Sequence, residues 1–176
     1  MSALDPEGER VAVVTGAGTG IGQAIAEKFG ALGWSVAIGG RRIERLAETV
    51  PLVEKAGGKC FPHVLDVTDA DSIESFFDNT EAELGKVSVV INNAAIGHYG
   101  RLEDFSPAEL AAEVATKLTG SLLMARRGIQ SMRAVGVGGD LLFISSASAV
   151  SPWPHHLPYA AANAGGLHSD ASITWQ

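Results

Sequence analysis

The sequence has little of several features that define large classes of proteins. It contains one cysteine, Cys60, which excludes an internal disulfide framework and a zinc site built on cysteines. This usage is typical of a reducing compartment, and we expect a cytoplasmic protein. No apolar run approaches the roughly 20 residues needed to span a bilayer. Residues 1–10 also lack the apolar core of a signal peptide.

Positive charge is scarce as well. The 176 residues include 13 Lys and Arg against 20 Asp and Glu, which gives a formal net charge of −7. This acidic balance disfavours nucleic acid or an anionic membrane as the main partner. The histidines, including His98 and His168, form no i, i+4 pair on a helix and no HExxH motif, so we expect no metal site.

What the sequence does contain is a regular alternation of apolar strands and helical segments. Strands are expected at 10–14, 34–39, 59–65, 87–91 and 140–145. Helices are expected at 21–32, 43–54 (interrupted by Pro51), 72–84 (capped by Asp69 or Asp71) and 107–130 (capped by Ser106). Because the strands are continuous apolar runs, they indicate a parallel sheet covered on both faces. The pattern predicts one α/β domain over 1–176, a doubly wound, Rossmann-like sheet of about five strands.

The first of these helices shows an apolar periodicity. Ile21, Ile25, Phe29 and Leu32 recur at spacings of three and four residues, which marks one helix face.

A glycine-rich turn, TGAGTGIG at 15–22, joins the first strand to this helix. Gly16, Gly20 and Gly22 have the spacing GxxxGxG. Glycines permit a tight turn and the close approach of a pyrophosphate, and the helix N-terminus presents free N–H groups. The turn therefore predicts a dinucleotide site. The alternative is a glycine-rich loop without a ligand.

The residues after the second strand bear on the choice between NAD and NADP. The sequence there is Gly39-Gly40-Arg41-Arg42, with no acidic residue to bind a ribose 2′-hydroxyl. Arg41 and Arg42 are suited to a 2′-phosphate, so we expect NADP rather than NAD. The alternative is two solvated arginines at the start of a helix.

Five segments, in this order, resemble the short-chain dehydrogenase/reductase family in its ketoacyl reductase-like branch. They are Thr15–Gly22, Asp66-Val67, Asn92–Ala95, Ser146 and Tyr159, and the resemblance runs over residues 10–166. It implies an oxidoreductase that transfers a hydride between NADP(H) and a small-molecule ketone or secondary alcohol. Ala95 stands where the family has glycine.

The resemblance implies a cofactor role for several of these residues. Asp66 would contact the adenine amino group and Val67 would line the adenine pocket. Asn93 and Ala94 would lie beside the cofactor ribose, with Asn92 steadying the central sheet. The full expected cofactor set is Gly16, Gly18, Thr19, Gly20, Ile21, Gly22, Arg41, Arg42, Asp66, Val67, Asn93 and Ala94.

The resemblance also implies the catalytic groups. Tyr159 would be the acid/base that exchanges a proton with the substrate oxygen. Ser146, 13 residues earlier, would hydrogen-bond the carbonyl. Without the family, Ser146 would be an ordinary strand end and Tyr159 an aromatic residue at a helix start. His155 and His156 are expected near Tyr159, where they could contact substrate.

Two residues depart from the family pattern at the catalytic centre. Asn163 occupies the position four residues after Tyr159, where the family has a lysine that holds the nicotinamide ribose and lowers the tyrosine pKa. Lys117 occupies a position on the long helix where the family has asparagine. One hypothesis is that Lys117 supplies the missing charge from the facing helix. The alternative is a snorkelling lysine beside a degraded site.

The family continues past the helix that contains Tyr159 into two more strands and a substrate-binding loop. We therefore expect a C-terminally short domain, whose strand 140–145 is an exposed edge. The family's usual dimer surface is the long helix 107–130, which leads us to expect a homo-oligomer. The second candidate function is a catalytically impaired nucleotide-binding protein or a truncated isoform of such a reductase.

Overall fold

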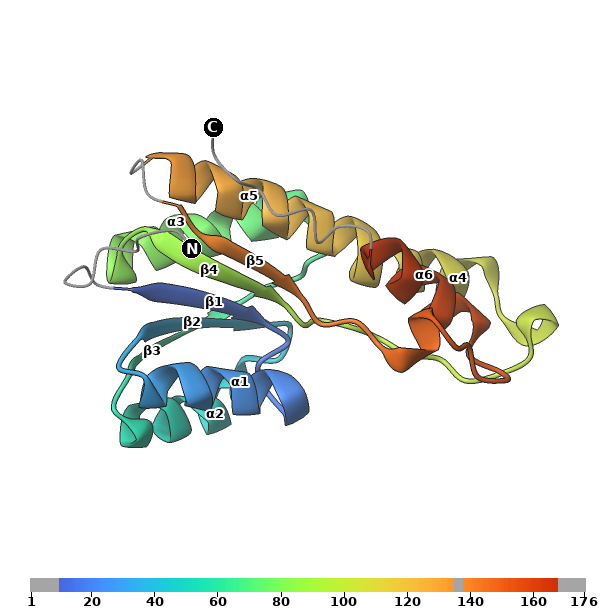
Figure 1. Cartoon of the computed structure of the whole chain (residues 1–176), viewed down its shortest axis with the longest axis horizontal. Helices are drawn as coiled ribbons and strands as arrows, with labels where there is room; N and C mark the ends of the chain where they lie inside the picture. Colours follow the sequence, from blue (N-terminus) through green and yellow to red (C-terminus); the bar gives the residue numbers. More distant parts are fainter. Residues whose placement is uncertain (1–9, 135–137, 168–176) are drawn as a thin grey trace.

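Five parallel strands form the central sheet of the protein (Figure 1). The structure is a computed structural model, and it describes residues 10–134 and 138–167. The strand order is β3-β2-β1-β4-β5. The strands are β1 (Val11–Thr15), β2 (Ser35–Gly40), β3 (Lys59–Val64), β4 (Val87–Asn92) and β5 (Asp140–Phe143). This confirms the predicted fold class, a doubly wound, Rossmann-like sheet.

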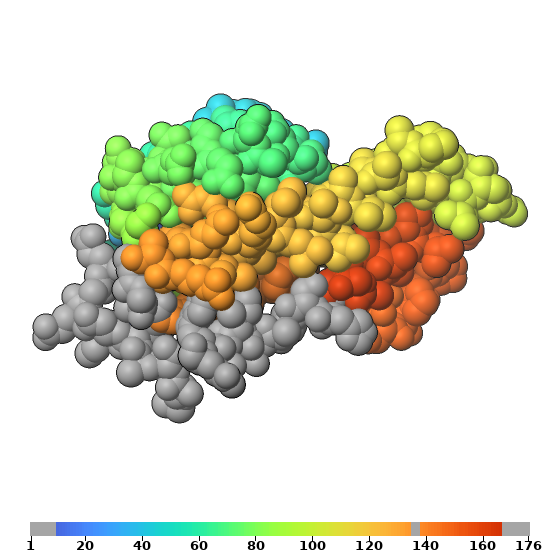
Figure 2. Space-filling model, turned by 90° about the horizontal axis from the view of Figure 1, so that it is seen from above, coloured from blue at the N-terminus to red at the C-terminus, as the bar shows by residue number. Residues whose placement is uncertain are grey.

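Helices cover both faces of the sheet (Figure 1). One face carries α1 (Gly20–Ala31) and α2 (Ile43–Ala56), and the other carries α3 (Ala70–Leu84) and α5 (Gly120–Ala134). Two further helices, α4 (Pro107–Val114) and α6 (Leu157–Leu167), pack together in a lobe that projects beyond the sheet (Figures 1 and 2). Short 3-10 turns lie at Leu102–Asp104 (η1) and Ala147–Ala149 (η3).

Each face of the sheet has its own buried core. In β1, Val11 and Val13 face α3 and α5, where they pack with Phe76 and Phe77 of α3. The alternate residues of β1 face α1 and α2. Because successive side chains of a strand point to opposite faces, an all-apolar strand is buried on both sides. All five residues of β1 are buried, as the continuous apolar run indicates.

Helix α1 packs by its small residues rather than by its largest apolar ones. Gly22, Ala26 and Gly30 are its buried residues, whereas Ile21 is 64% exposed and Leu32 is 61% exposed. A Cβ on Gly30 would lie 2.7 Å from the carbonyl oxygen of Val53 in α2. The apolar periodicity therefore wrongly placed Ile21 and Leu32, its first and last residues, on the packed face. The close approach of two helices requires small side chains instead.

Two helices differ from the sequence-based prediction in their course. Helix α2 continues through Pro51, where an interruption was expected, and it is anchored on both sides of the proline by the buried Leu46 and Val53. The predicted helix 107–130 is not a uniform α-helix: it contains a π-helical turn, η2 (Ala115–Thr119), between α4 and α5. Its predicted start is confirmed, since Ser106 and Glu109 form a capping box.

Strand β5 lies at the edge of the described sheet and pairs with β4 alone. Its residues are exposed or half-buried, and Leu142 is 41% exposed. The expectation of an exposed edge is met within residues 10–134 and 138–167. Among the helices of these residues, none has the length and apolar character needed to cross a membrane.

Candidate functional site

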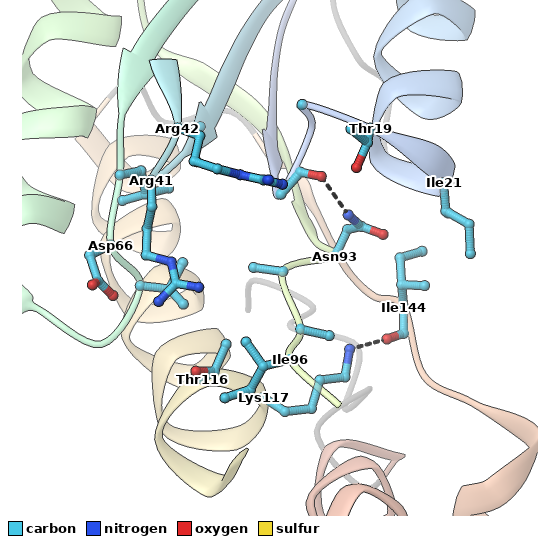
Figure 3. Close-up of a pocket in the computed structure, with 18 of the residues that line it drawn as sticks. Thr19, Ile21, Arg41, Arg42, Asp66, Asn93, Ile96, Thr116, Lys117 and Ile144 are labelled. Atoms are coloured by element: carbon cyan, nitrogen blue, oxygen red, sulfur yellow. Dashed lines mark hydrogen bonds between the residues drawn. The ribbon is translucent and has the colours of Figure 1, made fainter. Parts of the chain in front are cut away.

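A cavity of about 380 Å³ opens at the carboxyl ends of β1, β2 and β4 (Figure 3). It is the crevice in which doubly wound sheets bind their ligands. The predicted cofactor residues that line it are Gly16, Gly18, Thr19, Ile21, Arg41, Arg42, Asp66, Val67, Asn93 and Ala94. Gly20 and Gly22 do not line it.

The glycines of the turn serve different purposes. Gly16 and Gly20 have φ values of 65° and 60°, a left-handed conformation that favours glycine. Gly22 is required by packing, because a Cβ there would lie 2.5 Å from both Asn93 Nδ2 and the Gly16 carbonyl oxygen. The turn therefore presents backbone to the cavity at the N-terminus of α1, where an anion is favoured.

Asn93 and Thr15 fasten this turn to the end of β4. Asn93 Nδ2 donates to the carbonyl oxygens of Thr15 (2.9 Å) and Gly16 (3.3 Å). Thr15 Oγ1 accepts from the backbone N–H groups of Asn93 (3.0 Å) and Ala94 (2.9 Å). The side chain of Asn92, expected to steady the sheet, is buried and has no hydrogen-bond partner among the described residues. Asn93 instead links the two strands.

Charged side chains gather at one end of the cavity (Figure 3). Arg41 and Arg42 follow β2, and Arg41 lies near Asp66 at the end of β3. The pKa of Asp66 is lowered, first by the hydrogen bond that Thr68 Oγ1 donates to it and also by the charge of Arg41. Arg45 also lines the cavity but is paired with Glu48 at 3.1 Å.

The structure separates the two residues that depart from the family pattern. Lys117 lies in the π-helical turn η2, is 7% exposed and lines the cavity, where its Nζ donates to the carbonyl oxygen of Ile144 (Figure 3). Burial lowers the pKa of Lys117. Asn163 is fully buried, lines neither cavity described here, and donates from Nδ2 to the Tyr159 carbonyl oxygen at 2.9 Å. The structure therefore brings Lys117, but not Asn163, to the cavity.

Tyr159 stands where the first cavity meets a second one of about 430 Å³. Tyr159, Ala95 and Ile96 line both cavities. The other residues around the second cavity are Gly97, Ser146, Ser148, Trp153 and His156. The two predicted catalytic groups, Ser146 and Tyr159, thus face a common space.

The hydroxyl of Ser146 is oriented by its neighbour. Its Oγ accepts from the backbone N–H of Ser148 (3.2 Å) and from the Ser148 hydroxyl (2.9 Å). These bonds use acceptor capacity only, so the Ser146 proton is available to an oxygen in the second cavity.

Two of the other histidines lie outside the second cavity's lining. The ring of His155 lies 5.5 Å from that of Tyr99. His98 is bound to the buried Glu113, which accepts from its backbone N–H at 2.7 Å and contacts its Nδ1 at 3.1 Å. His168 lies outside the described residues.

Several residues of the site were not predicted from the sequence. Thr116 and Ser145 line the first cavity, and Ser148 and Trp153 line the second. Trp153 carried one usable signal, since an aromatic residue between Pro152 and Pro154 is held in a turn. The others carry no signal in a single sequence, because their place depends on segments that meet only in the fold.

A family model described as short chain dehydrogenase matches residues 10–172. The chain belongs to the short-chain dehydrogenase/reductase family. The match covers both the glycine turn and the segment that holds Ser146 and Tyr159.

Two relatives are consistent with this assignment. The chain is 35% identical over 162 residues to 3beta-hydroxysteroid dehydrogenase 1 of Eggerthella lenta, covering 92% of this chain and 62% of that protein. It is 34% identical over 145 residues to the probable oxidoreductase EphD of Mycobacterium tuberculosis, covering 82% of this chain and 24% of that protein. The chain therefore spans only part of the length of these curated relatives.

Solved structures agree in fold. A metagenomic short-chain oxidoreductase in complex with NADP is 36% identical with a TM-score of 0.85, covering 93% of this chain and 75% of that one. An alcohol dehydrogenase of the archaeon Thermococcus sibiricus, complexed with 5-hydroxy-NADP, is 31% identical with a TM-score of 0.84, covering 92% and 68%.

Proposed function

We propose that this short-chain dehydrogenase/reductase binds NADP(H) in the first cavity and interconverts a ketone and a secondary alcohol in the second. The observation that carries the proposal is the position of Tyr159, which lines both cavities. A proton donor at that junction is within reach of a substrate oxygen whose carbon faces the cofactor. The NADP complexes of two structural relatives support the choice of cofactor.

The residues of the first cavity fit a dinucleotide phosphate. The turn at Gly16–Gly22 offers backbone N–H groups at the start of α1, and a Cβ at Gly18 or Gly22 would lie 2.8 Å or 2.5 Å from neighbouring atoms. Arg41 and Arg42 would hold the 2′-phosphate, and Asp66 and Val67 would hold the adenine. When bound, the cofactor would donate or accept the hydride at the substrate carbon.

The chain's own residues would manage the charge that develops on the substrate oxygen. In the reduction direction, Ser146 donates a hydrogen bond to the carbonyl oxygen and Tyr159 delivers a proton to it as the C–H bond forms. In oxidation, Tyr159 takes that proton back. Lys117, held at Ile144 in the wall of the cavity that Tyr159 also lines, would supply a positive charge to that cavity.

A catalytically impaired nucleotide-binding protein is the second candidate. It is favoured by Asn163, which stands where the family has its lysine. The Asn163 side chain is neutral and buried, and it is hydrogen-bonded to the Tyr159 carbonyl oxygen of its own helix. The two candidates differ in whether Lys117 performs the task of that lysine.

Tyr159→Phe and Lys117→Met test the proposal in a turnover assay on a panel of ketones with NADPH. Tyr159→Phe should lower kcat by about 100-fold or more, since positioned acid/base groups contribute at least that much. Lys117→Met should also lower kcat, while NADPH still binds in both variants. Wild-type protein that binds NADPH but reduces no ketone would select the second candidate.

We also propose self-association through the long helix. Val114 of α4 and Leu122 of α5 are 43% and 47% exposed, which leaves apolar surface on this helix. Light scattering after size exclusion should give a mass above that of one chain, and a mass of one chain would refute this.

A further inference from the structure

The second cavity has walls of distinct chemistry. Its lining includes three hydroxyl-bearing residues, Ser146, Ser148 and Tyr159, and the ring side chains of Trp153 and His156. In the described part of the chain, no Asp, Glu, Lys or Arg lines it. A charged substrate would lose its hydration there without gaining an opposite charge, which is costly.

The ring side chains form a continuous array. The rings of Trp153 and His156 are stacked, with centroids 6.5 Å apart and planes inclined by 18°. His156 also contacts the ring of Tyr159 at 5.6 Å and that of Tyr99 at 4.9 Å. The array therefore leads from Tyr159 to the exposed rings of Trp153 and Tyr99.

Much of this aromatic surface remains open to solvent. Trp153 is 63% exposed and Tyr99 is 71% exposed. Large apolar side chains gathered beside a cavity mark a binding surface more often than chance exposure. A flat ring placed against Trp153 would cover this surface and gain the offset or edge contacts that aromatic groups favour.

The array is held in place by its backbone. Trp153 to His156 form a turn in which the His156 N–H donates to the Trp153 carbonyl oxygen at 3.3 Å and His155 has a φ of 65°. The Gly100 N–H donates to the His155 carbonyl oxygen at 3.0 Å, which fastens the turn to the loop after β4. A wall that is already ordered loses little entropy when a ligand binds.

We propose that this cavity selects uncharged ketones or secondary alcohols whose body is a flat ring system, with Trp153 and His156 as the residues that recognise the rings. The inference rests on the proposed function, because it places the carbonyl oxygen at Ser146 and Tyr159. A volume of about 430 Å³ is within the range of sites for ring-bearing small molecules.

Three ketones separate the possibilities in a turnover assay with NADPH. 2-Tetralone is uncharged and bicyclic with one flat aromatic ring, 2-butanone is uncharged and small, and acetoacetate carries a charge. We expect kcat/KM to be highest for 2-tetralone, by about tenfold or more over either of the others. Equal or higher values for 2-butanone or acetoacetate would overturn the proposal.

A variant pair then tests the wall itself. Trp153→Ala should raise the KM for 2-tetralone about tenfold and leave kcat/KM for 2-butanone within about twofold. Val150→Ala is the matched control, since Val150 is 77% exposed and does not line the cavity. An equal loss of kcat/KM for both ketones in Trp153→Ala would contradict ring recognition by Trp153.

A binding measurement separates failure of this inference from failure of the proposed function. Saturation-transfer NMR with NADP⁺ present should show contact between 2-tetralone and the wild-type protein, weakened in Trp153→Ala. Such binding without turnover would refute the reductase activity and support the ring site. Turnover of 2-butanone without detectable binding of 2-tetralone would support the reductase activity and refute the ring site. If 2-tetralone did not bind and no ketone were reduced, both proposals would be refuted.

Discussion

The two cavities of this protein differ in the kind of group that builds them. The first is made by backbone at the glycine turn and by charged side chains after β2 and β3. The second is made by hydroxyls and rings from the loop after β4, the segment after β5 and α6. The first therefore suits a phosphate-bearing cofactor and the second an uncharged substrate. Apart from Ala95, Ile96 and Tyr159, which line both cavities, we expect substitutions in one cavity to have a limited effect on the other.

The largest effect is expected at the glycine turn. In Gly22→Ala the new Cβ would lie 2.5 Å from Asn93 Nδ2 and the Gly16 carbonyl oxygen, so the turn must shift. We expect the free energy of unfolding to fall by about 3 kcal/mol and NADPH affinity to fall more than tenfold. Urea unfolding and equilibrium dialysis measure the two effects.

Gly166→Ala is the control for this substitution. No atom lies within 4 Å of a Cβ at Gly166 in α6, so its stability should change by less than about 1 kcal/mol. Unaltered NADPH affinity in Gly22→Ala would show that the turn does not hold the cofactor.

The loop that borders the second cavity depends on a buried carboxylate. Glu113 is fully buried and accepts from His98, which follows Gly97 in this loop. Glu113→Ala leaves the His98 N–H unpaired, and we expect a loss of about 2 kcal/mol in the free energy of unfolding. The KM for ketone should rise while NADPH affinity persists.

Glu113→Gln keeps an acceptor for the His98 N–H and should lose less stability. If Glu113→Ala weakened the binding of NADPH as much as the binding of ketone, this loop would affect both cavities equally.

A smaller effect, confined to the first cavity, is expected at Arg41. Arg41→Ala should lower the affinity for NADPH about tenfold and leave the affinity for NADH almost unchanged, because only NADPH carries the 2′-phosphate. The difference should shrink as salt is raised, since exposed charges are screened. Arg101→Ala, an exposed arginine paired with Glu103, should bind both cofactors as the wild type does. Equal weakening of NADPH and NADH in Arg41→Ala would contradict NADP preference.

The smallest effect is a change in how stability depends on pH. Burial lowers the pKa of Lys117 below its usual 10.5, so between the folded pKa and 10.5 the unfolded chain binds more protons than the folded one. The free energy of unfolding of the wild type should therefore rise with pH in that window, relative to Lys117→Met. Urea unfolding at a series of alkaline pH values measures this, and parallel curves would show that Lys117 is not desolvated.

The strands and most helices could be predicted from the sequence because their signals are local. Continuous apolar runs identified the parallel strands, and Ser106-Pro107 identified the start of α4. Ser146 and Tyr159 were predicted from the resemblance to the family, and their catalytic roles stay predictions. The packed face of α1 was misjudged, because Gly30 and Ala26 are buried by α2 and no local pattern shows that.

The sequence by itself determined the alternation of strands and helices, the glycine turn and the positions of the chemical groups. Only the tertiary structure decided which groups share a space. It placed Lys117, but not Asn163, in the wall of the first cavity, and it brought Ile96 and Gly97 together with Ser146 and Tyr159 around the second. The physical reason is that backbone propensity acts over a few residues. The direction of a side chain, by contrast, is set by packing between segments such as 95–97 and 146–159, which are far apart in the chain.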